Sequence, residues 1–216
     1  MQGLLDEKAP LLDSREADTA IFYSISNCQR GLAGISFGNF LIKRVVEELS
    51  SEFRNLRTFA TLSPIPGFRT WLIKERTRPD LLQPAEVKAL GGIVGNGAAQ
   101  PDLMQLLDRP GWQDDPMLMP AMRDPLLRLC AQYLLVEKGR GGRAADPVAH
   151  FHLTNGARVE RLNWLGDTSE KGMQQSGGLM VNYLYRLDHI ETNHEAYRGE
   201  GRVAAASTVR HLLRNR

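Results

Sequence analysis

An apolar stretch, a glycine-bearing turn and an amphipathic segment follow one another near the start of the chain. Residues 17–27 have a β-branched and aromatic centre bounded by polar residues, which predicts a buried strand. The turn at residues 34–39 carries two glycines and ends at Asn39, a residue typical of helix N-caps. Apolar side chains then recur at helical spacing: Phe40, Leu41, Val45, Val46, Leu49 and Phe53. This spacing predicts an amphipathic helix of about four turns.

A second strand is predicted at residues 57–62, directly after this helix. It should run parallel to the first strand, because a helix crosses between the two. Pro64 and Pro66 end the strand, since each fixes its own φ angle and holds the preceding residue in an extended conformation. Ser63 therefore lies where the strand stops.

The rest of the chain alternates between helical and extended patterns. Asp124 and Pro125 predict the start of a helix that ends at Gly139. Residues 146–153 predict a shorter helix, closed by Asn155 and Gly156. Further expected elements are two extended segments and a last helix, at residues 157–165, 179–187 and 203–213.

We predict a lead-in at residues 1–16, a main domain at residues 17–198 and a C-terminal helix at residues 199–216. Residues 77–115 are rich in proline, glycine and polar residues, with short helical pieces near residues 85–90 and 102–107. We interpret this stretch as an insertion or a lid within the main domain.

Composition narrows the class of protein. The chain has 216 residues, 42% hydrophobic and 24% charged, as an ordinary globular protein does. A net charge of +2 is too small to indicate nucleic acid or an anionic membrane as partner. Cys28 and Cys130 are far apart and lack metal-ligand spacing, so we expect reduced thiols, no disulfide and no metal site. We find no membrane-spanning stretch or signal peptide and expect a cytoplasmic protein.

The glycine-bearing turn is the first candidate binding site. A turn at a helix N-terminus aims free backbone N–H groups and the positive end of the helix dipole at any nearby anion, which favours a phosphate-bearing ligand. The turn lacks the Gly-Lys-Ser/Thr sequence of a Walker loop and the three-glycine spacing of a dinucleotide site. A purely structural strand-to-helix turn therefore stays open as the alternative.

Ser63 and two histidines are the candidate reactive groups. Ser63 lies at the end of a parallel strand, where open α/β sheets bind ligands, although a serine before proline is also a common turn residue. His150 and His152 are two residues apart, a spacing that places them on different faces of a helix or on the same face of a strand. In the predicted helix, at most one of them faces a site. A lone histidine beside Phe151 and Leu153 is otherwise typical of a hydrogen-bonded core or surface residue.

Five blocks of sequence, in order between about residues 17 and 185, resemble the catalytic portion of the malonyl-CoA decarboxylase family. They are Ala-Ile-Phe-Tyr-Ser-Ile-Ser at 20–26, Gly-Ile-Ser-Phe-Gly-Asn-Phe-Leu-Ile-Lys at 34–43, Thr-Leu-Ser-Pro-Ile-Pro-Gly-Phe at 61–68, Asp-Pro-Val-Ala-His-Phe-His-Leu-Thr-Asn-Gly-Ala at 146–157 and Gly-Leu-Met-Val-Asn-Tyr at 178–183. The resemblance implies an α/β (α+β) fold, with an incomplete GNAT acetyltransferase-like mixed sheet flanked by helices. It also implies decarboxylation of malonyl-CoA to acetyl-CoA and CO₂ without any cofactor, since CoA is part of the substrate.

The resemblance also implies roles for particular residues. Ser63 and His152 match the catalytic serine and histidine and would both contact malonyl-CoA, and Tyr185 resembles a tyrosine that orients the histidine. The malonyl-CoA-binding turn would comprise Ala33, Gly34, Ile35, Ser36, Phe37, Gly38 and Asn39. His152 would protonate the thioester enolate left by CO₂, a task suited to a side chain with a pKa of about 6.5.

Members of this family are typically longer, with an N-terminal helical domain and earlier strands. We therefore expect an unpaired strand edge at Ile21 and Phe22, covered by another copy in a homo-oligomer or by a complementing N-terminal half. Two other functions stay open. One is a GNAT-fold acyltransferase, and the other is a non-catalytic acyl-CoA-binding module.

Overall fold

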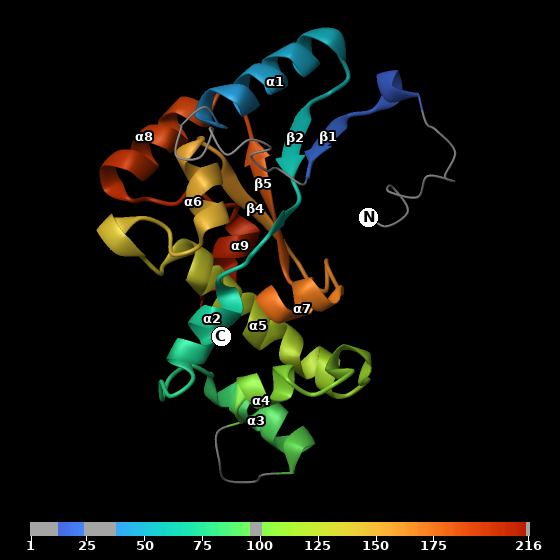
Figure 1. Ribbon diagram of the computed structural model, residues 1–216, viewed down its shortest axis with the longest axis vertical. Helices are drawn as coiled ribbons and strands as arrows, with labels where there is room; N and C mark the ends of the chain where they lie inside the picture. Colours follow the sequence, from blue (N-terminus) through green and yellow to red (C-terminus); the bar gives the residue numbers. More distant parts are fainter. Residues whose placement is uncertain (1–12, 24–37, 96–100, 215–216) are drawn as a thin grey trace.

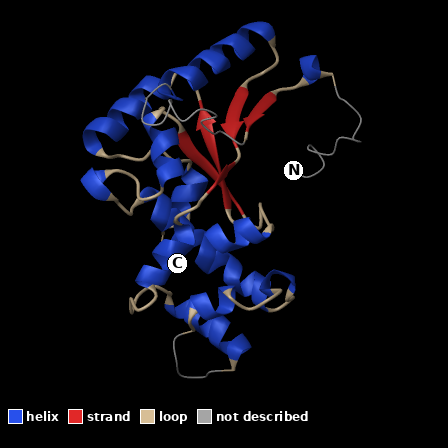
Figure 2. Cartoon of the chain, in the orientation of Figure 1, coloured by secondary structure: helices blue, strands red, loops and turns tan. Residues whose placement is uncertain are grey.

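A mixed five-stranded sheet forms the centre of the α/β part of the molecule. The computed structural model describes residues 13–23, 38–95 and 101–214. Its strands are β1 (Thr19–Phe22), β2 (Thr58–Thr61), β3 (Ser63–Pro64), β4 (Arg158–Asn163) and β5 (Met180–Tyr185). The strand order is β1-β2-β5-β3, and β4 pairs with the other side of β5. Figure 1 shows the sheet in the upper half of the molecule, and Figure 2 shows the strands gathered there with helices around and below them.

The described helices lie beside the sheet and in a second, lower group. They are α1 (Gly38–Glu52), α2 (Phe68–Glu75), α3 (Pro84–Val94), α4 (Leu103–Leu107), α5 (Leu118–Leu135), α6 (Pro147–Thr154), α7 (Glu170–Ser176), α8 (Ile190–Glu200) and α9 (Ser207–His211). Short 3₁₀ turns occupy Ser14–Glu16, Trp112–Asp114 and Arg140–Gly142. In Figure 1, α1, α6 and α8 accompany the sheet, while α2 to α5 form the lower part.

The predicted parallel pairing of the first two strands is confirmed. Strands β1 and β2 run parallel, with Ile21 opposite Ala60 and Phe22 opposite Thr61. Strand β1 pairs with no other described strand, so it forms the expected edge of the sheet, with Ile21 and Phe22 half-buried. An edge strand of this kind offers free backbone groups to a further strand.

Two predicted helix starts are wrong. Helix α1 begins at Gly38, so Asn39 lies inside its first turn and does not cap it. Helix α5 begins at Leu118, and Pro125 lies in its interior. The Asp115 carboxylate accepts hydrogen bonds from the amides of Met117 and Leu118, and so satisfies free N–H groups at the start of the helix. Asp124 had been expected to take this role at a later start. Burial of the first turns against the core outweighs the cost of the internal proline.

The buried face of the sheet is formed by alternate side chains of β5. Val181, Tyr183 and Tyr185 are buried, whereas the residues between them are only half-buried. This alternation is the period of two expected for a strand with one covered face. The other face borders an open groove of about 610 Å³ along β1, β2, β4 and β5.

Helices form within residues 77–115 at the predicted places. Helices α3 and α4 coincide with the expected helical pieces, and Leu90 and Trp112 are buried in the core. Helix α3 packs on α5. Whether the stretch is an insertion stays a prediction.

Candidate functional site

The fold brings Ser63 and His152 together across a sequence separation of 89 residues. Ser63 Oγ lies 3.1 Å from His152 Nε2. The serine is 4% exposed and the histidine 2% exposed, so the contact is almost completely enclosed. A hydroxyl and an imidazole at this distance can exchange a proton or share one hydrogen bond.

Local sequence signals explain how each partner is held. Ser63 begins the short strand β3 and pairs with Val181 of β5. His152 lies in α6, which confirms the helix predicted at residues 146–153; it starts at Pro147 and is capped by Asp146. The Asp146 carboxylate accepts hydrogen bonds from the amides of Val148 and Ala149 at 2.9 and 3.0 Å. Proline at the first position and aspartate at the cap are both favourable for this helix start.

Asp146 also joins the helix of His152 to the segment that follows Ser63. Its Oδ2 atom accepts a hydrogen bond from the Gly67 amide at 3.2 Å and another from the Tyr133 hydroxyl at 3.4 Å. The carboxyl group is fully buried, and this burial is the main reason why its pKa is raised. One side chain therefore links the start of α6 to the start of α2, four residues after Ser63.

Two tyrosines of β5 contact the histidine. The Tyr185 hydroxyl lies 2.7 Å from His152 Nδ1, which is the arrangement expected of an orienting residue. The Tyr183 ring stacks on the imidazole with centroids 4.4 Å apart and an interplanar angle of 24°. Both ring nitrogens of His152 are thus occupied, and one face of the ring is covered.

Sequence reasoning missed a further member of the site, Thr61. Its Oγ1 atom lies 2.8 Å from Ser63 Oγ, and its side chain is fully buried. The signal that could have found it is the spacing of two residues, which places Thr61 and Ser63 on the same side of an extended segment.

Burial keeps His152 neutral. Desolvation lowers the pKa of His152 from 6.5 to about 3, because burial removes the ring from solvent and so disfavours its charged form. Burial likewise raises the pKa of the Tyr185 hydroxyl. The pKa of His152 was expected near 6.5, whereas burial lowers it to about 3, so the buried ring is a neutral imidazole near pH 7.

The second histidine lies apart from this site. His150 Nδ1 is 2.8 Å from the Tyr197 hydroxyl, which also accepts a hydrogen bond from the Ala144 amide. Burial lowers the pKa of His150, and the nearby cations Arg143 and Arg198 lower it further. As expected from their spacing, only one of the two histidines reaches Ser63.

Most of the predicted binding turn cannot be assigned a geometry. Residues 33–37 lie outside the described residues, and Gly38 and Asn39 form the start of α1. The described residues contain no group of three or more histidine, cysteine, aspartate or glutamate side chains that could hold a metal. Cys130 is fully buried, and burial raises the pKa of its thiol, so it is unsuited to act as a nucleophile.

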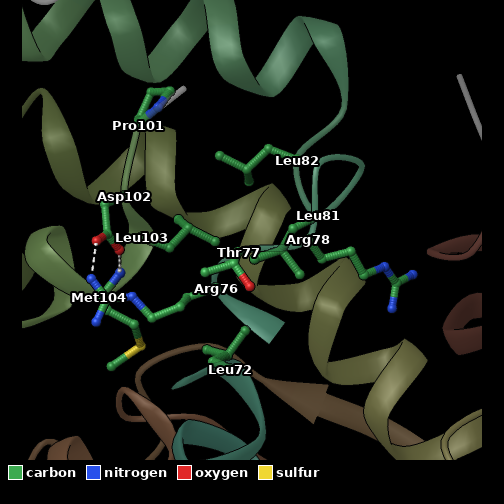
Figure 3. A pocket seen from close by; sticks show the side chains of 10 residues that line it. All are labelled: Leu72, Arg76, Thr77, Arg78, Leu81, Leu82, Pro101, Asp102, Leu103 and Met104. Atoms are coloured by element: carbon green, nitrogen blue, oxygen red, sulfur yellow. Dashed lines mark hydrogen bonds and ion pairs between the residues drawn. The ribbon is translucent and has the colours of Figure 1, made fainter. Parts of the chain in front are cut away.

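A cavity of about 290 Å³ lies in the lower group of helices, away from the candidate site (Figure 3). Leucines form much of its lining, and Asp102 bridges its polar rim through an ion pair with Arg76 at 2.9 Å. The same carboxylate caps α4 by accepting a hydrogen bond from the Met104 amide. Its charged groups already have partners, and none of the predicted site residues lines it.

Fold and site together define a mixed α/β protein of the GNAT-like class, with a buried serine–histidine pair at a break in the central sheet. All of residues 1–216 match the family described as Malonyl-CoA decarboxylase C-terminal domain, and the chain belongs to this family.

Relatives of this chain carry the same description. The malonyl-CoA decarboxylases of goose (Anser anser anser) and mouse (Mus musculus), both named as mitochondrial, are 44% and 42% identical to it. The alignments cover 91% and 99% of this chain but only 40% and 45% of the relatives. The chain therefore spans less than half the length of these curated relatives.

Solved structures agree with this assignment. Malonyl-CoA decarboxylase from Rhodopseudomonas palustris superposes with a TM-score of 0.84 at 52% identity, over 97% of this chain and 45% of that one. The enzyme from Agrobacterium vitis gives a TM-score of 0.85 at 48% identity, over 99% of this chain and 50% of that one.

None of the described helices is long and apolar enough to cross a membrane.

Proposed function

We propose that this chain carries the catalytic site that converts malonyl-CoA to acetyl-CoA and CO₂, as part of malonyl-CoA and fatty-acid metabolism. The observation that carries the proposal is the buried contact of Ser63 with His152, itself in contact with Tyr185. Family membership over the full chain supports the substrate.

The chemistry requires stabilisation of one developing charge. Loss of CO₂ from a malonyl thioester leaves a thioester enolate, whose oxygen becomes negative as the bond breaks. Ser63 would donate a hydrogen bond to the malonyl group and hold it with the breaking bond perpendicular to the carbonyl plane. His152 would support Ser63 and supply the proton that converts the enolate to acetyl-CoA. No cofactor takes part in this proposal.

The lowered pKa of His152 shapes its proposed role. A neutral imidazole donates a hydrogen bond without bringing a positive charge that would bind the malonyl carboxylate tightly in the ground state. As the enolate forms, its negative charge raises the proton affinity of the neighbouring ring. His152 would then take up a proton from solvent as the enolate forms and pass it to the α-carbon, so that the ring returns to its neutral form.

We assign binding of the CoA part to the turn at residues 33–39. Its last two residues begin α1, a helix of 15 residues, whose dipole would favour a pyrophosphate at its N-terminus. The turn residues Ala33, Gly34, Ile35, Ser36, Phe37, Gly38 and Asn39 would supply the backbone N–H groups.

We further propose that a second polypeptide segment covers β1. This segment would belong either to a complementing N-terminal half or to another copy in a homo-oligomer. Two observations support this proposal: β1 lies at the edge of the sheet, and the chain spans less than half the length of its curated relatives. The alternative function, a non-catalytic acyl-CoA-binding module, is not favoured by the family match. We propose a cytoplasmic location, which cell fractionation would test against the mitochondrial names of the goose and mouse relatives.

The test is incubation of the purified chain with malonyl-CoA in the absence of any acceptor amine. Release of CO₂ with formation of acetyl-CoA supports the decarboxylase, whereas turnover only after an amine is added indicates an acyltransferase. The binding module is identified if the chain binds acyl-CoA but releases no CO₂, and if CO₂ release is restored when the N-terminal half of a longer relative is added. His150→Ala is the matched control variant, because His150 lies on the same helix but contacts Tyr197 instead of Ser63.

A further inference from the structure

Thr61 occupies the break between the two strands that lead into the site. Strands β2 and β3 pair with successive stretches of β5, and Leu62 lies between them. At this break the Tyr183 amide of β5 donates its hydrogen bond to a side chain instead of a backbone carbonyl: Thr61 Oγ1 accepts it at 3.2 Å. The Thr61 carbonyl accepts a further hydrogen bond from Asn182 Nδ2 at 2.6 Å. The threonine is therefore held from both its side chain and its backbone.

Its hydroxyl extends the line of contacts from Ser63 and His152 to Tyr185. The separations are 2.8 Å for Thr61–Ser63, 3.1 Å for Ser63–His152 and 2.7 Å for His152–Tyr185. Three hydroxyls and a neutral imidazole bring four protons to these three contacts, so one proton has no partner within the group. Where this spare proton lies decides the direction of every hydrogen bond.

Hydrogen-bond partners and donor strength place the spare proton on Ser63. A buried proton without an acceptor is costly, and the Thr61 hydroxyl, which already accepts a hydrogen bond from the Tyr183 amide, finds an acceptor for its own proton in Ser63 Oγ. A phenol is a good donor to an imidazole nitrogen, which accounts for the short contact of Tyr185 with Nδ1. Nε2 then carries the proton of His152 and donates it to Ser63.

We propose that Thr61 is a positioning residue that donates its hydroxyl proton to Ser63 Oγ alongside His152. This proposal rests on the proposed function. Two donors on one oxygen leave the proton of Ser63 free to be donated to the malonyl group. They also make that hydroxyl a stronger donor, because hydrogen bonds in a chain polarise one another.

Kinetics of three threonine variants test this role. Thr61→Val removes the hydroxyl at nearly constant volume, Thr61→Ser keeps it, and Thr58→Val removes a hydroxyl from the same strand. For CO₂ release from malonyl-CoA, we expect Thr61→Val to lower kcat about fivefold to tenfold, the size of one hydrogen bond, with KM changed less than about twofold. Thr61→Ser and Thr58→Val should stay within about twofold of the parent. An unchanged kcat in folded Thr61→Val, or equal losses in Thr61→Val and Thr61→Ser, overturns the proposal.

A second measurement does not depend on activity. Nitrogen-15 NMR of the histidine-labelled parent chain reports which ring nitrogen of His152 carries the proton, with His152→Gln used for assignment. The proposal predicts the Nε2–H form near neutral pH. The Nδ1–H form would mean that Ser63 donates to His152, which overturns the proposal even if the chain decarboxylates malonyl-CoA. An inactive chain with the Nε2–H form would count against the proposed function and support the hydrogen-bond arrangement.

Discussion

Burial of neutral His152 predicts that this residue contributes to destabilisation of the chain in moderate acid. The pKa of His152 falls from 6.5 to about 3 on folding, because burial disfavours the charged ring. Between these two values the unfolded chain binds a proton that the folded chain does not. The stability contributed by keeping His152 neutral is therefore complete above pH 6.5 and is lost as the pH falls toward the folded pKa.

The size of the effect follows from proton linkage. Each pH unit in this window costs about 1.4 kcal/mol, so lowering the pH from 7 to 5 should cost about 2 kcal/mol through His152. The figure changes little if the folded pKa is a unit higher, because pH 5 still lies above it. The pKa of Asp146 is raised mainly by burial, so this residue makes the folded state more stable as the pH falls, opposite to His152. Its contribution cancels when the parent chain is compared with a variant at residue 152.

Urea unfolding followed by circular dichroism measures this difference. Free energies of unfolding are compared at pH 7 and pH 5 for the parent chain and for His152→Gln, which cannot titrate in this range. The parent should lose about 2 kcal/mol more than the variant between the two conditions. Equal losses in the two proteins, within about 0.5 kcal/mol, would refute the argument that His152 is buried in its neutral form.

Three further predictions concern the surroundings of the site and the lower helices. A methyl group at residue 67 would collide with the Tyr133 hydroxyl, so Gly67→Ala should lower the free energy of unfolding by about 1–3 kcal/mol, and Tyr133→Phe in the same chain should restore part of it. Arg128 and Glu86 form a nearly buried ion pair at 2.7 Å, so Arg128→Met should cost about 3–5 kcal/mol in thermal or urea unfolding, whereas a loss below about 1 kcal/mol would contradict this. The buried thiol of Cys130 should react with iodoacetamide only when the chain is unfolded, as peptide mapping by mass spectrometry would reveal.

Elements with their own local signals were predictable from the sequence. The Asp146-Pro147 start and the Asn155-Gly156 end delimit α6 because capping is a short-range effect. The alternating side chains of β5 and the parallel pairing of β1 and β2 also follow from local patterns and from the helix between the strands. Helix α7 was not predicted, although Ser169 and Gly177 cap its two ends.

The start of α5 and the electrostatics of the site were not predictable in the same way. Burial of Leu118 and Met122 against the core decides that the helix continues through Pro125, and that burial depends on tertiary structure. Family resemblance indicated Ser63, His152 and Tyr185, but the sequence carries no measure of the enclosure that makes the histidine neutral. His152 is enclosed by side chains of elements that are far from it in the sequence, such as Ser63 of β3 and Tyr183 of β5.

Initial rates of CO₂ release from malonyl-CoA by the purified chain and its Ser63→Ala variant test the central claim most directly. The parent should release CO₂ without any acceptor, and loss of the serine hydroxyl should lower kcat by about 100-fold or more, the usual effect of removing one donor to a developing oxyanion. His150→Ala, the control on the same helix as His152, should keep the parental rate. A Ser63→Ala variant within about twofold of an active parent would contradict the assignment of the buried serine–histidine pair as the catalytic site.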